Sequence, residues 1–283
     1  APDENLDPSP NPNPNPNPNP NPNPNPTTER LYLLDTYLFE ADAAALSVEA
    51  LEPNPKDDAT HAVILDRTVF HAQGGGQPAD LGTITADGAV FEVTGVRSAG
   101  DAVHHFGSFR GGDGDAPAAF AAGAAVHLSV DEVKRVAHAR CHSAGHALDV
   151  AVARIFGEDW VAGKGYHFLD GPYVEYIGKL APEMKETIVD TLNEKIAEVL
   201  SEDIPTEVLY LSPEEAKAAC GTPDADFSHI TAPTIRVVTV AGGGTCPCGG
   251  THVRSTAELG GVTVTKVKSK KGRIKVSYSV TPP

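Results

Sequence analysis

A run of eight Asn-Pro pairs at residues 11–26 limits the fold of this chain more than any other sequence feature. Proline fixes φ and has no backbone N–H, so it is excluded from helix interiors and from central strands. Eleven of the 24 prolines lie before residue 27, in a stretch with almost no apolar side chain. We therefore predict that residues 1–28 form a disordered leader, either a spacer or a segment that binds a partner.

The remaining residues are enough for one large domain or two modest ones. The net charge of −16, from 38 acidic and 22 basic residues, excludes a uniformly basic nucleic-acid binder, and we expect no DNA partner. Contact with RNA must therefore come from a local basic patch. Four cysteines do not make a disulfide scaffold, and no apolar run of about 18 residues predicts a membrane span. The polar start predicts no secretory signal, so we expect a cytoplasmic protein whose oligomeric state is not predicted.

The first half after the leader is predicted to be mostly β. Short apolar runs alternate there with clusters of Gly, Pro and Asp, a pattern typical of strands that are separated by turns. We place this β-rich domain at residues 29–125 and an α+β domain at residues 126–283. The predicted strands of the first domain are 30–35, 61–66, 83–85, 89–93 and 103–106.

Two helices are predicted in the second half. Ser129-Val-Asp-Glu132 has the form of a capping box, and apolar residues then recur at helical spacing up to Gly157, a natural end. A second helix begins near Pro182, which suits a first turn. The remaining predicted elements are a strand at 207–211, a short helix at 213–219, a strand at 234–240 and a hairpin at 262–280.

A metal site is indicated by four residues from two distant segments. His142 and His146 are four apart on the first predicted helix, so both imidazoles lie on one face. Cys248 and His252 are also four apart, but the glycines between them predict a turn. Three nitrogens and one sulfur are a donor set that suits zinc.

Neighbouring residues leave alternatives open for this site. Cys246 could replace Cys248 as a ligand or remain a free thiol, whereas Cys141 is expected to face the core. Ser143 follows His142 where a zinc metallopeptidase of the His-Glu-x-x-His type has glutamate, which argues against a peptide or amide hydrolase. A structural-zinc RNA-binding module remains the alternative to an enzyme, since structural sites use four closed ligands.

These residues carry a family resemblance. His142-Ser-Ala-Gly-His146 and Cys248-Gly-Gly-Thr-His252 resemble the paired metal motifs in the editing domain of alanyl-tRNA synthetase and its free-standing relatives, the AlaX trans-editing proteins. The glycine-rich segment 68–82 and the segment 163–176 agree with the same family, so that the similarity spans about residues 30–280. No ATP motif and no further C-terminal domain is seen, and in this respect the chain resembles the medium-length class of AlaX proteins.

The resemblance implies a fold and a function. The expected fold is an N-terminal β-barrel-like domain followed by an α+β editing domain with one Zn²⁺ at His142, His146, Cys248 and His252. The expected activity is hydrolysis of tRNA(Ala) mischarged with serine or glycine. Because a catalytic zinc keeps one position open, we expect three firm ligands and one that exchanges, Cys248 or His252.

Selectivity and RNA binding are assigned to further residues. Thr68 is the expected contact to the serine hydroxyl, with Gln77 as its support, although Thr68 could equally be a plain strand residue. Gly74, Gly75 and Gly76 either present backbone N–H groups to the substrate or form a structural turn. A predicted phosphate patch, or alternatively a solvated strand edge, consists of Lys266, Lys268, Lys270, Lys271 and Arg273.

Overall fold

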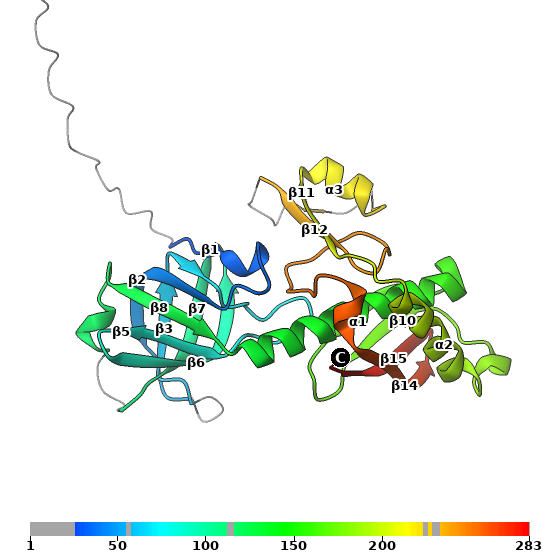
Figure 1. Ribbon diagram of the computed structural model, residues 1–283, viewed down its shortest axis with the longest axis horizontal. Helices are drawn as coiled ribbons and strands as arrows, with labels where there is room; N and C mark the ends of the chain where they lie inside the picture. Colours follow the sequence, from blue (N-terminus) through cyan, green and yellow to red (C-terminus); the bar gives the residue numbers. More distant parts are fainter. Residues whose placement is uncertain (1–25, 55–57, 112–115, 223–225, 228–232, 283) are drawn as a thin grey trace, which may run out of the picture.

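The computed structural model describes residues 26–54, 58–111, 116–222, 226–227 and 233–282. It is a mixed α/β structure in which a closed β-barrel stands beside a second part made of a four-stranded sheet, a three-stranded sheet and helices. Figure 1 shows the barrel at the left and the long helix α1 (Glu132–Phe156) running from it into the second part. Most of the predicted leader, residues 1–25, lies outside the described residues.

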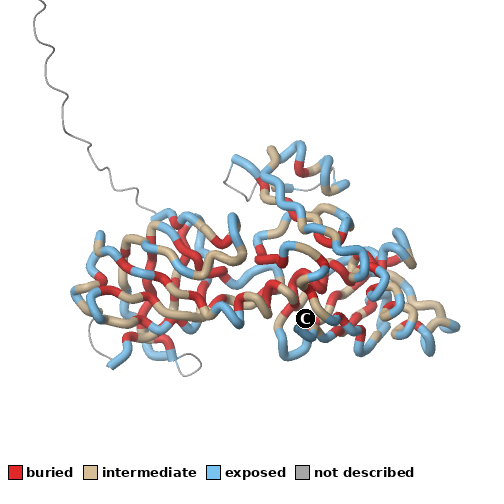
Figure 2. The backbone as a smooth tube through the Cα atoms, viewed as in Figure 1, coloured by how far each residue is buried: buried red, intermediate tan, exposed pale blue. Residues whose placement is uncertain are grey.

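Six antiparallel strands close the barrel in the order β2-β3-β7-β6-β5-β8. Its interior is filled by fully buried apolar side chains such as Leu65, Phe91 and Leu128. Figure 2 colours the backbone by burial, and buried segments run through the barrel. A barrel that closes on itself leaves no unpaired strand edge, which explains how many short strands form one stable unit. The six strands are β2 (Glu40–Ala50), β3 (His61–Leu65), β5 (Gly82–Ala86), β6 (Ala89–Ala99), β7 (Ala102–Phe109) and β8 (Ala125–Val130).

Two features lie across the ends of the range expected for the β-rich domain, residues 29–125. Thr28, which the sequence placed in the leader, is buried, and its hydroxyl donates to Leu65 O at 2.8 Å. Strand β8 crosses the expected boundary after residue 125 and pairs with both β2 and β5. Strand β8 of the barrel thus extends to Val130, and Thr28 is bound to β3 of the barrel although it lies outside the six strands.

The strand predicted over residues 30–35 is wrong. Only β1 (Glu29–Arg30) is extended there, paired in parallel with β4 (Arg67–Thr68), and a 3₁₀ turn, η1 (Leu31–Leu33), follows. The turn buries Tyr32 edge-on against His71, with ring centroids 5.2 Å apart. The apolar run thus packs against the barrel core without pairing as a strand.

The cap of helix α1, Asp131, lies two residues after the position predicted for it. Ser129 belongs to β8, and Asp131 caps the helix by accepting from the Lys134 N–H at 3.0 Å. The strand pairing of Ser129 excludes the predicted capping box. The helix ends at Gly157, as predicted, with the positive φ of 55° that glycine adopts without strain.

The four-stranded sheet has the order β14-β15-β10-β9, and α1 and α2 (Ile188–Ser201) pack on its inner face. The predicted C-terminal hairpin is confirmed: β14 and β15 are joined at Lys271 and Gly272, both with positive φ, as tight hairpin turns require. The second helix starts later than Pro182 because the short 3₁₀ turn η4 (Pro182–Met184) precedes it. The strands of this sheet are β9 (Val161–Tyr166), β10 (Tyr173–Ile177), β14 (Gly261–Lys270) and β15 (Arg273–Thr281).

A small antiparallel sheet carries the C-terminal pair of candidate ligands. It has the order β11-β12-β13, and α3, with a full capping box at Ser212 and Glu215, packs beside it. The strand β13 leads directly into the loop that carries Cys248 and His252. The elements of this region are β11 (Glu207–Leu211), α3 (Pro213–Ala219), β12 (Ile235–Thr239), β13 (Cys246–Pro247) and the 3₁₀ turn η5 (Thr256–Leu259).

A buried ion pair locks α1 to the barrel. Arg135 and Asp80 are 0% and 1% exposed, and the Arg135 Nε lies 3.1 and 2.9 Å from the two carboxylate oxygens. Arg135 also donates to the carbonyl of Thr36 at 2.8 Å and to that of Val69. A buried guanidinium with all these partners satisfied holds the first turns of α1 in one position, and with them His142 and His146.

None of the helices in the described residues combines the length and apolar character that crossing a bilayer requires.

Candidate metal centre

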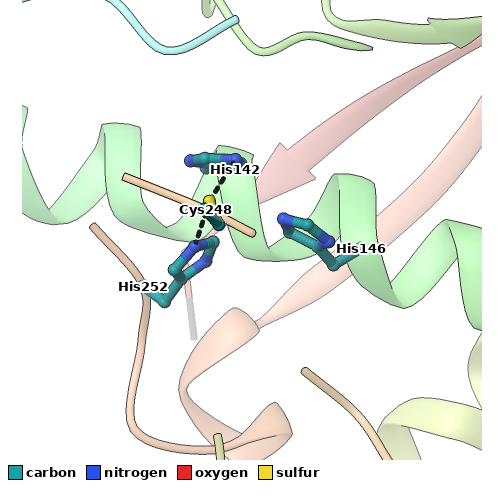
Figure 3. A group of neighbouring side chains, drawn as sticks. All are labelled: His142, His146, Cys248 and His252. Carbon is teal, nitrogen blue, oxygen red and sulfur yellow. Dashed lines mark hydrogen bonds between the residues drawn. The ribbon is translucent and has the colours of Figure 1, made fainter. Parts of the chain in front are cut away.

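Four side chains from α1 and from the loop after β13 meet at one point (Figure 3). His142 and His146 project from successive turns of α1, and Cys248 and His252 face them from the loop. The candidate ligand atoms of all four residues lie within 4.8 Å of one another. The Cys248 sulfur lies 3.2 Å from His252 Nε2 and 3.7 Å from His142 Nε2.

Two of the imidazoles are oriented by partners outside the cluster. Gln77 Oε1, which can only accept, lies 2.8 Å from His142 Nδ1, so His142 carries its proton there. Ser143 Oγ lies 3.0 Å from His252 Nδ1 and accepts the Val253 N–H at 3.1 Å. With the Nδ1 atoms engaged, the Nε2 atoms of both rings lie toward Cys248, the arrangement that outer partners impose on metal-binding histidines.

The third imidazole leaves a buried atom without a partner. His146 Nε2 has no hydrogen-bond partner among the described residues, although burial of such an atom is unfavourable. A metal ion would satisfy this atom. The donor set and the orphaned nitrogen together fit a metal ion at this point.

Burial keeps the three histidines in the form that binds metal. Burial lowers the pKa of His146 to about 4, and burial together with the neighbouring histidines holds the pKa of His142 and of His252 well below 6.5. All three rings are therefore neutral at pH 7, as ligation requires. Burial raises the pKa of the Cys248 thiol, a shift that a bound cation reverses because a coordinating thiol loses its proton.

The structure separates Cys248 from the other cysteines near the site. Cys246, the alternative ligand, lies outside the four-residue cluster, with its sulfur 3.9 Å from His146 Nδ1. Cys141 is fully buried in the core beside Tyr278, as expected, and burial raises its pKa to about 11.

A cavity of about 790 Å³ opens beside the cluster. His142, His146 and Cys248 form part of its wall, and the lining also includes glycines of β9 and of the 242–244 loop. This volume lies within the range of pockets that hold small ligands. The cluster therefore faces a space in which a substrate group could reach it.

Two functional candidates in this wall were not found from the sequence. Asp149 accepts from the Tyr176 hydroxyl at 2.7 Å, and burial raises its pKa to about 7. His167 stacks on His142, with centroids 4.6 Å apart, and its Nδ1 lies 2.7 Å from Tyr278 Oη. The spacing of Asp149 was an available signal, because three residues after His146 is the same helical face.

Thr68 lies outside the four-residue cluster and outside the cavity beside it. It is fully buried in the barrel, its hydroxyl lies 2.7 Å from His105 Nε2, and it accepts the Phe70 N–H at 3.0 Å. Thr68 is absent from the lining of the 790 Å³ cavity. Its two hydrogen-bond partners thus lie outside the cluster. The contact between Thr68 and a serine hydroxyl stays a prediction.

The glycine-rich segment is a tight turn that positions Gln77. Gly74 and Gln77 exchange backbone hydrogen bonds at 3.2 and 2.9 Å around Gly75 and Gly76, both with positive φ. A Cβ on Gly76 would lie 2.5 Å from the Gly165 carbonyl oxygen, so glycine is required for the close approach to β9. Gly75 alone of the three lines the cavity. The segment thus forms a structural turn with one glycine at the cavity wall.

Gln77 is the link between this turn and the cluster. Besides His142, its Oε1 accepts the Thr251 N–H at 3.0 Å, and its Nε2 donates to Thr251 Oγ1 at 2.8 Å. The residue is fully buried. It therefore acts by positioning His142 and the ligand loop.

The predicted basic patch lies on the hairpin. Lys268 stands opposite Lys275, and Lys270 opposite Arg273, so like charges face each other across the two strands. All five predicted residues, Lys266, Lys268, Lys270, Lys271 and Arg273, are exposed. Among the described residues, Arg273 alone of these five makes an ion pair, with Glu175 at 3.8 Å.

Comparison with known proteins places these features in a family. Residues 28–134 match the family "tRNA synthetases class II (A)", and residues 235–275 match the "Threonyl and Alanyl tRNA synthetase second additional domain". The second match contains two of the four cluster residues, Cys248 and His252.

Individual relatives of the chain are alanine–tRNA ligases and an alanyl-tRNA editing protein. An alanine–tRNA ligase of Korarchaeum cryptofilum is 30% identical over 90% of this chain, and one of Methanobrevibacter smithii is 30% identical over 85%. The chain spans about a quarter of these ligases, 26% and 25% of their lengths. The alanyl-tRNA editing protein AlaX-M of Methanosarcina acetivorans is 32% identical over 86% of this chain and 94% of its own length. The chain therefore belongs to the alanyl-tRNA synthetase-related family of alanyl-tRNA editing proteins.

Proposed function

We propose that this protein is an aminoacyl-tRNA deacylase that acts in trans on tRNA(Ala) mischarged with serine, with the glycine ester as a second substrate. The observation that carries the proposal is the cluster His142, His146, Cys248 and His252, which opens onto a cavity in a chain of the editing family. Removal of mischarged amino acids takes place where tRNA is charged, so the proposed location is the cytoplasm.

One zinc ion is the proposed cofactor. His142, His146, Cys248 and His252 would hold it, and the orphaned His146 Nε2 supports a ligand role for that residue. When bound, zinc supplies a Lewis acid for the ester carbonyl and lowers the pKa of a water molecule. The exchangeable ligand in this proposal is Cys248 or His252, because both lie on a loop, whereas His142 and His146 lie on a helix anchored at Arg135.

The side chains around the ligands have roles of their own. Gln77 and Ser143 hold two imidazoles with their Nε2 atoms toward the centre. The carboxylate of Asp149, which lines the same cavity as the ligands, would accept a proton from the attacking water while Tyr176 orients it. Asp149 is the proposed general base.

The β14–β15 hairpin with its basic patch, called the basic hairpin below, supplies the proposed electrostatic contact to the tRNA. The patch consists of Lys266, Lys268, Lys270, Lys271 and Arg273. Like charges directly opposite each other on a sheet are unfavourable, so their placement across β14 and β15 needs a reason outside folding. In a chain with a net charge of −16, this face gives a polyanion a local point of attachment.

A structural-zinc RNA-binding module is the second candidate, favoured by the presence of four protein donors that could close the site. A peptide or amide hydrolase has less support. Ser143 stands where such an enzyme has its glutamate, and its hydroxyl is engaged by His252 and Val253.

Deacylation of two substrates separates these candidates. Protein that has been purified with its metal is mixed with Ser-tRNA(Ala) or Ala-tRNA(Ala), with and without chelator. The proposal expects fast loss of serine, slow loss of alanine, and no loss in chelator. Binding of both tRNAs without loss of serine would identify the RNA-binding module instead.

A further inference from the structure

A stack of three aromatic rings lies on the outer face of the four-stranded sheet. Phe168 stacks on Tyr166, with centroids 4.5 Å apart and planes at 10°, and Tyr166 stacks on Tyr173 at 5.3 Å and 19°. The ammonium of Lys275 lies 3.2 Å from the centroid of the Tyr173 ring. We name Phe168, Tyr166 and Tyr173, with Lys275, the aromatic ladder.

The strand register places the ladder away from the core. Tyr166 is directly opposite Tyr173, and Tyr173 is opposite Ser277. The residues that alternate with them, Val174 and Val276, are buried in the core beneath the sheet. Neighbouring side chains along a strand point to opposite faces, so the ladder faces outward, and its three rings are only half-buried.

The ladder is pre-formed and ends at Phe168. The Tyr166 hydroxyl donates to Asp170 at 3.2 Å, and Lys275 covers the far side of Tyr173. Among the described residues, Phe168 has a ring partner on one side only, Tyr166. Because Phe168 is partly exposed, a flat π-system could stack on this ring and extend the ladder.

The same face is positively charged. Lys268, Lys270, Arg273 and Lys275 are grouped by the register of β14 and β15, beside the ladder on β10 and β9. Rings that stack bases, next to cations that neutralise phosphates, are the two elements with which proteins bind single-stranded nucleic acid. Binding of a folded protein or of a lipid surface does not require stacking rings and phosphate-neutralising cations on the same face.

One residue connects the ladder to the metal centre. His167 lies between Tyr166 and Phe168 but points to the inner face, where it stacks on His142. Strand β9 is the edge of its sheet, and its glycines Gly163 and Gly165 line the cavity. A polynucleotide lying on the ladder therefore has to cross only this narrow, glycine-rich edge to reach the cluster.

We propose that the aromatic ladder, together with the basic hairpin, is a stacking platform for the unpaired nucleotides at the 3′ end of the RNA substrate. This inference rests on the proposed function for the identity of the RNA. The terminal base or its neighbour stacks on Phe168, and the sheet edge guides the esterified end into the cavity. Stacking reads any base, so the platform recognises a single-stranded end and leaves sequence recognition to other contacts.

The test uses binding alone, so it does not depend on hydrolysis. The probes are two fluorescein-labelled, uncharged RNA hairpins with the acceptor-stem sequence of tRNA(Ala), one with its unpaired 3′ nucleotides and one blunt. Fluorescence anisotropy gives the dissociation constants for wild type, Phe168→Ala and Phe168→Tyr. Leu169→Ala is the matched control, because Leu169 is adjacent and 53% exposed but lies outside the ladder.

The platform predicts that wild type prefers the tailed hairpin and that Phe168→Ala weakens its binding by about 5- to 150-fold, the range for loss of one stacked base. Binding of the blunt hairpin stays unchanged, Leu169→Ala matches wild type, and Phe168→Tyr restores the preference. Equal affinity of wild type for both hairpins, or equal weakening of both by Phe168→Ala, would overturn the inference. A preference for the tail in a protein that releases no serine would refute the proposed function and leave the platform standing.

Discussion

Replacing Gln77 with leucine tests how far the metal centre depends on the barrel. Gln77 is fully buried and connects the glycine turn to both metal-binding segments. Its Oε1 accepts from His142 Nδ1 and from the Thr251 N–H, and its Nε2 donates to Thr251 Oγ1, at distances of 2.8, 3.0 and 2.8 Å. Leucine is similar in volume, so the substitution removes these hydrogen bonds and leaves the packing nearly intact.

The expected losses follow from the groups left behind. The Thr251 N–H and the His142 Nδ1–H are stranded in a buried place, and each stranded donor costs about 1–3 kcal/mol. The free energy of unfolding should therefore fall by about 2–6 kcal/mol. Removal of the outer partner of a metal-binding histidine weakens metal affinity by about 10- to 100-fold, which is the effect expected for zinc here.

A chelator-competition titration measures the zinc affinity of folded Gln77→Leu protein. Gln77→Glu is the matched control, because its carboxylate still accepts from His142 and from the Thr251 N–H. We expect Gln77→Glu to keep zinc affinity close to that of wild type while Gln77→Leu loses it. A folded Gln77→Leu variant with wild-type zinc affinity would refute the positioning role and leave Gln77 as a purely structural residue.

Three further predictions concern Asp149, Thr68 and the basic hairpin. In the zinc-free protein the raised pKa of Asp149 means that its contribution to stability is present below the unfolded pKa near 3.8 and is lost as pH rises through about 7. Denaturant unfolding of Asp149→Asn should therefore show a variant that gains stability relative to wild type over this window, and a pH-independent difference would contradict the assignment. Thr68→Val should lower the free energy of unfolding by about 1–3 kcal/mol, because His105 and the Phe70 N–H lose a buried partner, while the preference for serine over alanine in deacylation stays unchanged. A changed preference would instead support the predicted contact between Thr68 and the serine hydroxyl. Charge reversal at Lys268 and Lys270 should weaken tRNA binding and flatten its salt dependence, with zinc content unchanged, and an unaltered salt slope would show that the hairpin is only a solvated edge.

Local patterns predicted much of the fold. The spacing of His142 and His146 located a helix face, and the apolar alternation around Gly272 located the hairpin, because both patterns depend on periodicities of the chain itself. The capping box at Ser129 was wrong because pairing of that residue in β8 outweighs a local preference. Similarly, the run at 30–35 lacks a long strand partner and folds as a turn that buries Tyr32.

In the candidate site, too, local motifs could be predicted from the sequence and contacts between distant segments could not. The four cluster residues follow from motifs whose spacing is informative by itself, and the structure brings their ligand atoms together. Thr68 could not be placed in this way, since a strand residue faces either side and its partner His105 is 37 residues away. His167 and the aromatic ladder depend on the pairing of β9 with β10, which no local pattern in the sequence reveals.

The most direct measurement is a zinc titration of activity. Metal-free protein is given zinc in increments, and the initial rate of serine release from Ser-tRNA(Ala) is recorded together with bound zinc. We expect the rate to rise in proportion to zinc up to one ion per chain and then to stay constant, and we expect His146→Ala neither to retain the ion nor to gain activity. Full activity without zinc, or none with one ion bound, would contradict the claim that this cluster carries the reaction.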